Sequence, residues 1–407
     1  MSEVHHLWLR LYRFFTSFQV ELRGHYTAER IQALAKYLAS TSTPRTLLIS
    51  VFSPLPCLVI VALVECVPLA PTEDGSRGNA VFWGRDLVAA SLMMRAVLEQ
   101  IRVAVPGLGM TPLQAIVVAI VATTVSTADD GSRDSELRDI IRSIVGAELR
   151  KEMNSFANVQ NCPMPIYLYG FNRLGPLGQN MYLGLLPVIK IIGKNWISYF
   201  LRNKYELMAQ IMIFNLDVFN AMYVLSCIQN SKSLSTTFIS IGLDAVLAWV
   251  SMTDLRIMTK RVFLLRLIHQ EAENARVSSF HQVPIHGFIL LTSSGIDSER
   301  AAQVLFTAEF AILVLYTKFI VPFLFATCTC ILFYMPNRAY YPQLEGYDDG
   351  VLKEKVSNVA VLGVSQFVLL VVNGLILQRR LGVPVLHLLS FGLDHGKKSP
   401  YSMVNPL

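Results

Sequence analysis

Seven charged side chains near the middle of long apolar stretches are candidate site residues of this 407-residue chain, because a charge at such a position is costly and therefore informative. Near the middle of a membrane helix each charge costs about 2.5 to 3.5 kcal/mol, so it needs a partner or a water-filled cavity. The acidic and basic members are nearly balanced, which indicates ion pairing inside a helix bundle. These candidate site residues are Arg95, Glu99, Lys190, Asp217, Asp244, Glu309 and Lys318.

Two hypotheses account for these charges. In the first, Lys190, Asp217 and Asp244 form a polar track for an ion, a proton or a polar solute. In the second, they fix the register of neighbouring helices by pairing with one another or with three nearby asparagines, Asn195, Asn215 and Asn220. We favour the second hypothesis, because most charges inside a bundle are balanced by a neighbour.

Two prolines inside apolar stretches bear on the same choice. Pro187 and Pro322 each lack a backbone donor and can break a membrane helix. Broken helices are typical of transporter sites, which favours the transport hypothesis, but prolines are also common in membrane helices without such a role. An internal inverted repeat is not visible in the sequence, and this counts against transport.

The elements that must position the charges are apolar segments of membrane-spanning length. The first, LLISVFSPLPCLVIVALVECVPLA, is about long enough to cross a hydrocarbon core roughly 30 Å thick. The sequence predicts an all-α polytopic membrane helix bundle of about eight transmembrane helices. The predicted spans are Leu47–Ala70, Asp86–Val105, Leu108–Thr127, Asn180–Phe200, Glu206–Ile228, Thr236–Thr253, Val304–Tyr334 and Val356–Leu377, whereas Val383–Leu393 is too short and is expected to lie along the interface.

Composition supports a membrane class and excludes others. Hydrophobic residues make up 53% of the chain and charged residues only 16%. The net charge of +6 is scattered between the apolar stretches, so it does not form the basic stripe of a nucleic-acid-binding protein. We expect the lipid bilayer as the partner, with other membrane proteins or a second copy of the chain as further candidates, and no nucleic acid.

Chain organisation follows from the apolar segments and the basic residues between them. Residues 1–46 are predicted to form a cytosolic amphipathic N-terminal segment, 47–393 the transmembrane helical domain and 394–407 a polar C-terminal tail. Basic residues in short loops favour cytosolic termini at both ends, in the plasma membrane or an endomembrane. The segment Asp129–Arg173 weakens this topology, because the eight-helix arrangement places its basic residues on the outer side.

Signatures of enzymes and metal sites were not found. The chain has no HExxH, GxSxG, Walker A or Rossmann glycine motif. Three acidic turns, at 73–75, 129–131 and 348–350, are ordinary turn chemistry, and the histidines between 269 and 286 are interpreted as a solvated loop. We therefore expect no catalytic residue, no cofactor and no metal.

Five motifs carry a resemblance to a known family. They are SPLPC (53–57), NAVFWGR (79–85), LLPVIKIIGKNWIS (185–198), IFNLDVFNAMYV (213–224) and MPNRAYYP (335–342). In this combination the chain resembles, from about Pro44 to about Phe391, a family of multi-pass membrane proteins of oomycetes such as Phytophthora. The resemblance implies class and lineage only. The resemblance also implies two differences. Family members have a further apolar segment where this chain has the short acidic stretch Asp129–Arg133, and they continue beyond the polar tail in which this chain ends. This chain is therefore expected to be a shortened variant or an imperfect gene model.

The function predicted at this level is that of a multi-pass integral membrane protein without enzymatic activity, with an undefined scaffold or accessory role. The alternative is a channel or secondary transporter that uses the intramembrane charges.

Overall fold

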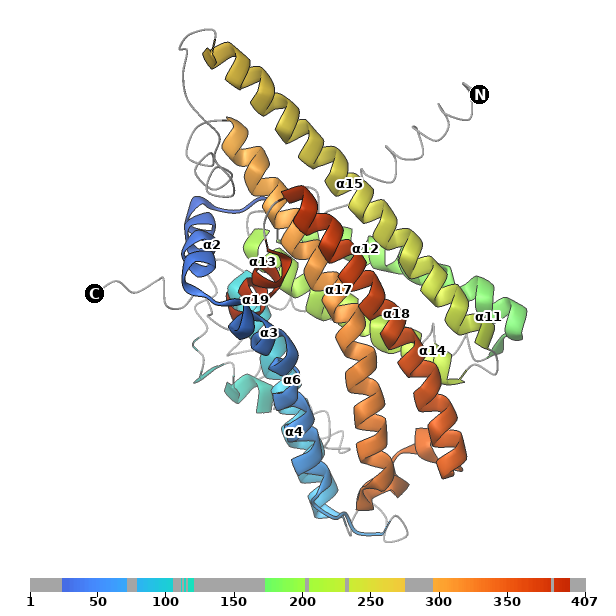
Figure 1. The fold of residues 1–407 in the computed structure, drawn as a ribbon. Helices are drawn as coiled ribbons and strands as arrows, with labels where there is room; N and C mark the ends of the chain where they lie inside the picture. Colours follow the sequence, from blue (N-terminus) through green and yellow to red (C-terminus); the bar gives the residue numbers. More distant parts are fainter. Residues whose placement is uncertain are drawn as a thin grey trace. The chain divides into compact units, whose positions relative to one another are not determined.

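The computed structural model describes residues 24–71, 79–104, 111, 113–114, 116–120, 173–201, 205–230, 234–274, 296–381 and 384–395. Every regular element in these ranges is a helix, which confirms the predicted all-α fold (Figure 1). Several expectations lie outside the described residues: residues 1–23, the tail from 396, most of the span Leu108–Thr127, the segment Asp129–Arg173 and two acidic turns at 73–75 and 129–131.

The chain divides into two compact units, each assembled from separate segments of sequence. The first comprises Met1–Cys57, Phe171–Ala326 and Glu354–Leu407, and the second comprises Leu58–Gly170 and Thr327–Lys353. The boundaries fall within three helices: α4 (Leu55–Glu65), α17 (Ile296–Tyr334) and α18 (Asp349–Leu381). Long helices therefore contribute residues to both units.

Five helical segments are long and apolar enough to cross a membrane, among the residues that are described. They agree with five of the predicted spans and are Thr43–Glu65, Met208–Gln229, Thr236–Lys260, Glu299–Tyr334 and Asp349–Arg379. The first combines α3 (Thr43–Phe52) with α4, and the third is the beginning of α15 (Leu234–Asn274). The short helix α19 (Val385–His395) agrees with the expectation of a segment too short to cross.

The count of about eight spans is not confirmed. The span predicted at Asn180–Phe200 is divided at Gly184 into α11 (Pro176–Leu183) and α12 (Leu185–Phe200). At 1.5 Å per residue the 16 residues of α12 reach about 24 Å, which is short of a hydrocarbon core. The span predicted at Asp86–Val105 does form a helix, α6 (Ala80–Ala104), but it is too rich in charge to count as a candidate span.

The two prolines leave their helices intact. Pro187 occupies the first turn of α12, where a missing backbone donor has no intrahelical partner to lose. Pro322 lies inside α17, which continues to Tyr334. On α18, Gly363 faces Pro322 closely enough that an added Cβ would lie 3.6 Å from the proline Cβ. Pro322 therefore does not break its helix, whereas the span predicted at Asn180–Phe200 is divided at Gly184, three residues before Pro187.

The core of the first unit forms where α17 and α18 run antiparallel beside α14 (Phe219–Asn230) (Figure 1). The aromatic rings of Phe319 and Phe367 lie 5.2 Å apart, at the level where these two helices cross the core. Nearby, a buried apolar cluster joins all three helices. It consists of Ala221, Leu225, Ile228, Val321, Val359 and Leu362, with Ile241 of α15 packed against it.

Helices near the two ends of the chain pack together in the same unit. The helix α2 (Ala28–Ser40) and α3 both contact α19. The Tyr37 hydroxyl donates to Ser390 Oγ at 3.1 Å, and the His387 ring shares a hydrogen bond of 3.1 Å with the Thr41 carbonyl. The Tyr37 ring also meets the edge of Phe391. The C-terminal helix is thus held by side chains from before the first span.

Candidate functional site

The predicted charges Lys190 and Asp217 form an ion pair between α12 and the π-helical segment η3 (Ile213–Val218). Both side chains are largely buried: 14% of the lysine is exposed and none of the aspartate. The two segments approach closely because α12 carries Gly193 at the crossing, where a Cβ would meet Leu216 Cδ2 at 2.7 Å. Two of the sequence motifs, 185–198 and 213–224, therefore meet at this pair.

The segment η3 interrupts the span Met208–Gln229 at the position of Asp217. A π-helix inserts one residue into an α-helical turn, which widens the turn and redirects the side chains. Asn215 Nδ2 donates back to the Ile211 carbonyl at 2.9 Å, so its amide group serves its own helix. Asn195 does the same to Ile191 at 2.9 Å. Both asparagine amides thus donate to carbonyls of their own helices, and Lys190 is the ion-pair partner of Asp217.

A second ion pair joins Asp244 of α15 to Lys318 of α17. The other carboxylate oxygen of Asp244 accepts a hydrogen bond from Gln366 Nε2 of α18 at 2.7 Å. One carboxylate therefore connects three of the candidate spans. Sequence reasoning found Asp244 and Lys318 but missed Gln366, whose position among apolar residues at the centre of a span was the available signal.

These two ion pairs are close enough to interact. Asp217 experiences the positive charges of Lys194 and Lys318 in addition to that of Lys190. The Lys194 ammonium lies over the ring of Phe310, 5.0 Å from its centroid. We call the residues Lys190, Asp217, Asp244, Lys318 and Gln366 the central charge cluster.

Glu309 pairs with a residue from outside the predicted membrane domain. Arg30 Nη2 of α2 lies 2.8 Å from Glu309 Oε1 of α17, and both side chains are largely buried. The Arg30 guanidinium also lies over the rings of Tyr26 and Phe391, at 5.1 and 5.3 Å. The segment 1–46 was predicted as cytosolic, and only the tertiary structure reveals this contact with a span.

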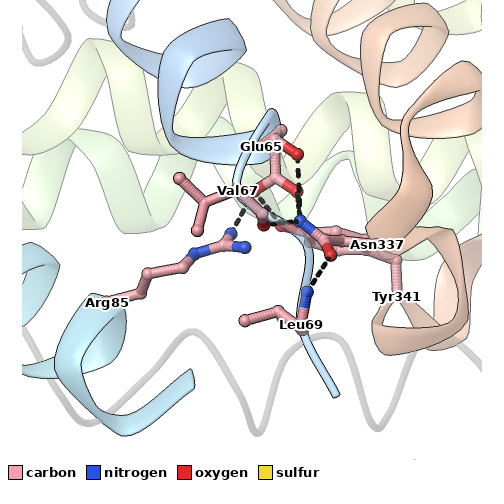
Figure 2. A network of polar contacts seen from close by, with 6 residues as sticks. All are labelled: Glu65, Val67, Leu69, Arg85, Asn337 and Tyr341. Carbon is pink, nitrogen blue, oxygen red and sulfur yellow. Dashed lines mark hydrogen bonds and ion pairs between the residues drawn. The ribbon is translucent and has the colours of Figure 1, made fainter. Parts of the chain in front are cut away.

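A fourth ion pair lies in the second unit, where Glu65 at the end of α4 pairs with Arg85 of α6 (Figure 2). The Tyr341 hydroxyl donates to Glu65 Oε1 at 2.6 Å. Burial, together with the adjacent Glu65 carboxylate, raises the pKa of Tyr341 to about 12. Sequence reasoning missed this site, although Glu65 is the single charge in the stretch 47–70.

Asn337 of the helix η5 (Pro336–Tyr340) closes the end of α4 (Figure 2). Its Nδ2 donates to the carbonyls of Glu65 and Val67 at 3.0 and 2.8 Å, while its Oδ1 accepts from Leu69 N at 2.8 Å. The last carbonyls of a helix have no intrahelical partner, so this side chain supplies what a further turn would have supplied. The structure thereby determines where the first span ends, five residues before the predicted Ala70.

The same network brings two sequence motifs together in the second unit. Asn79 of the 79–85 motif contacts the Tyr340 hydroxyl of the 335–342 motif, and the rings of Phe82 and Tyr340 stack at 5.5 Å. We call Glu65, Arg85, Asn337 and Tyr341 the junction network.

The predicted residue Arg95 does not join either group. Arg95 on α6 is exposed, and the side chain of Glu99 lies outside the described residues. In the described part of the chain, three or more His, Cys, Asp or Glu side chains do not gather as metal ligands would. The described residues instead provide buried pairs of opposite charge.

An all-helical protein with apolar helices of membrane-spanning length, linked by buried ion pairs, is the class that these observations define. Comparison with models of protein families, with curated proteins and with solved structures finds no match.

Proposed function

We propose that the protein is a multi-pass integral membrane protein without enzymatic activity, with a scaffold or accessory role, and that its intramembrane charges hold the helices in register. The observation that carries this proposal is the pairing of charges across different helices. Lys190 with Asp217, Lys318 with Asp244 and Arg30 with Glu309 each link two different helical elements. The proposal includes membership of the oomycete family of multi-pass membrane proteins that the sequence motifs resemble.

Membrane insertion is tested first. The full chain expressed in eukaryotic cells should stay in the pellet after an alkaline carbonate wash and leave it only with detergent. Recovery in the supernatant would overturn the proposal, because apolar helices such as Asp349–Arg379 would then have to be buried inside a water-soluble protein instead of in lipid.

The role of the central charge cluster is tested with Lys190 and Asp217. Replacing one partner, as in K190M or D217N, should destabilise the detergent-solubilised protein by about 3 to 5 kcal/mol, because the other charge stays buried alone. The double variant K190M/D217L should recover most of the loss, since apolar residues of similar size can replace a buried pair. The matched control is K353M, which removes an exposed lysine.

A channel or secondary transporter is the second candidate function, and one specific observation favours it. The π-helical segment η3 lies within a candidate span and carries Asp217, which interacts with three lysines. Such segments occur frequently at functional sites. Under this hypothesis K190M/D217L folds but loses a measurable ion or proton flux in proteoliposomes, whereas the scaffold role predicts the same flux baseline for the variant and the wild type.

A further inference from the structure

Two helices of the first unit each present an exposed apolar stripe that ends in cations. On α15 the stripe includes Phe238 and Trp249, which are 63% and 73% exposed. Arg256 follows Trp249 by seven residues, about two turns, and is therefore on the same face. Lys260 lies one turn further, and both cations are exposed.

The second stripe lies on α18 and has the same pattern. Val361, Val368 and Val372 are all exposed, at spacings of seven and four residues. Arg379 follows Val372 by seven residues and is exposed on the same face. A surface that is apolar for several turns and then cationic matches a phospholipid, whose acyl chains and headgroup follow in this order.

The two cationic ends lie at the same level of the unit. Asp244 of α15 and Gln366 of α18 are hydrogen-bonded. Ile241 of α15 packs against the cluster that contains Leu362 of α18, and the two helices run in the same direction (Figure 1). At 1.5 Å per residue, Arg256 lies about 18 Å beyond Asp244, and Arg379 about 20 Å beyond Gln366.

This level corresponds to a headgroup region. The candidate span Asp349–Arg379 contains 31 residues and is about 45 Å long, which matches a bilayer with its headgroups. The hydrogen bond between Asp244 and Gln366 is then near the bilayer centre. The first turn of α17 carries the exposed Glu299 and Arg300 about 27 Å beyond Lys318, further than the cationic ends of α15 and α18. On α15, Asp254 precedes Arg256 by two residues but is buried, so the exposed charges of that turn are cationic.

We propose that Arg256 with Lys260 on α15, and Arg379 on α18, bind the headgroups of anionic phospholipids whose acyl chains lie along the adjoining apolar stripes. The proposal rests on the membrane role proposed above. It names a chemical class of partner, an anionic diacyl lipid, and one leaflet in which that lipid is bound.

The test uses the full chain in nanodiscs that contain equal amounts of phosphatidylglycerol and phosphatidylcholine. The ratio of the two lipids retained by the protein is measured by native mass spectrometry. We expect the wild type to retain phosphatidylglycerol preferentially. Because a cation near the surface contributes about a five-fold preference, R379Q should lower the ratio about five-fold and R256Q/K260Q by more than ten-fold.

Two controls make the outcome specific. K353Q removes an exposed lysine about 39 Å away at the other end of α18 and should leave the ratio unchanged, and R379K should retain it. Equal loss in K353Q, or no preference in the wild type at low salt, overturns the proposal. If the glutamine variants do not fold, the wild type decides alone, since its preference must fall between 50 and 500 mM salt.

A free anion is distinguished from a lipid in a further arm. Inorganic phosphate should reduce the preference no more than chloride at the same ionic strength. A selective loss with phosphate would assign the cations to a free phosphate site and overturn the lipid proposal. Failure here is separable from failure of the membrane role, because a carbonate-resistant protein without lipid preference contradicts only this inference.

Discussion

Asn337 Nδ2 donates a hydrogen bond of 2.8 Å to the carbonyl of Val67, just beyond the end of the first span. The same side chain donates to the carbonyl of Glu65 and accepts from the amide of Leu69, so one residue from after α17 contacts three alternate residues at the end of α4 and just beyond it. Asn337 is 2% exposed, and water has little access to these groups.

Replacing Asn337 by Ala should therefore lower the free energy of unfolding by about 1 to 3 kcal/mol, because the carbonyls lose a partner while they remain buried. Thermal or SDS-induced unfolding in detergent measures the change. The matched control is N373A: Asn373 is also buried, but among the described residues its Nδ2 donates to Leu369 O of its own helix. An equal loss in both variants would contradict the assigned role.

The hydroxyl of Tyr341 should make stability depend on alkaline pH. Its pKa is raised from 10 to about 12 in the folded state, so folding favours the protonated form. The resulting stabilisation is complete below pH 10 and is lost as the pH rises from 10 to 12. Y341F should show a smaller loss than the wild type in that window, measured by unfolding midpoints. Y334F, which changes an exposed tyrosine, should keep the wild-type slope.

Replacing either partner of Asp244 should lower the free energy of unfolding, because this carboxylate connects α15, α17 and α18. K318M leaves the carboxylate without its cation and should cost about 3 to 5 kcal/mol. Q366L removes a single hydrogen bond to a charged group and should cost about 1.5 to 3 kcal/mol. Unfolding in detergent measures the loss of stability in each variant. A larger loss for Q366L than for K318M would show that the ion pair contributes less than the hydrogen bond from the amide.

A methyl group at Gly392 should disturb the Arg30–Glu309 pair. A Cβ there would meet Glu309 Oε1 at 2.8 Å and Leu313 Cδ1 at 3.0 Å. Because Arg30 holds the carboxylate in place, G392A should destabilise the protein by about 1 to 3 kcal/mol. The control is G242A on α15, where a Cβ meets nothing within 4 Å. That variant should be neutral or up to about 1 kcal/mol more stable, and a similar loss in both would remove the steric explanation.

The helical class and five of the spans were predictable from the sequence, because a run of apolar residues long enough for a bilayer is a local property. Lys190, Asp217, Asp244, Glu309 and Lys318 were predictable for a similar reason, since a charge among apolar residues is visible without knowledge of its partner. The break at Gly184 was not foreseen. The exclusion of α6 as a span follows from charges such as Arg95, Glu99 and Arg102, which are visible in the sequence and make that span doubtful.

The amino-acid sequence by itself determined which segments prefer hydrocarbon and which charges need compensation, because both follow from composition over a few turns. Only the tertiary structure decided the partners: Asp217 for Lys190, Gln366 and Lys318 for Asp244, and Arg30 for Glu309. It also ended the first span at Glu65 through Asn337, a residue 272 positions away. Contacts at such separations arise from helix packing, and periodicity along one segment carries no information about them.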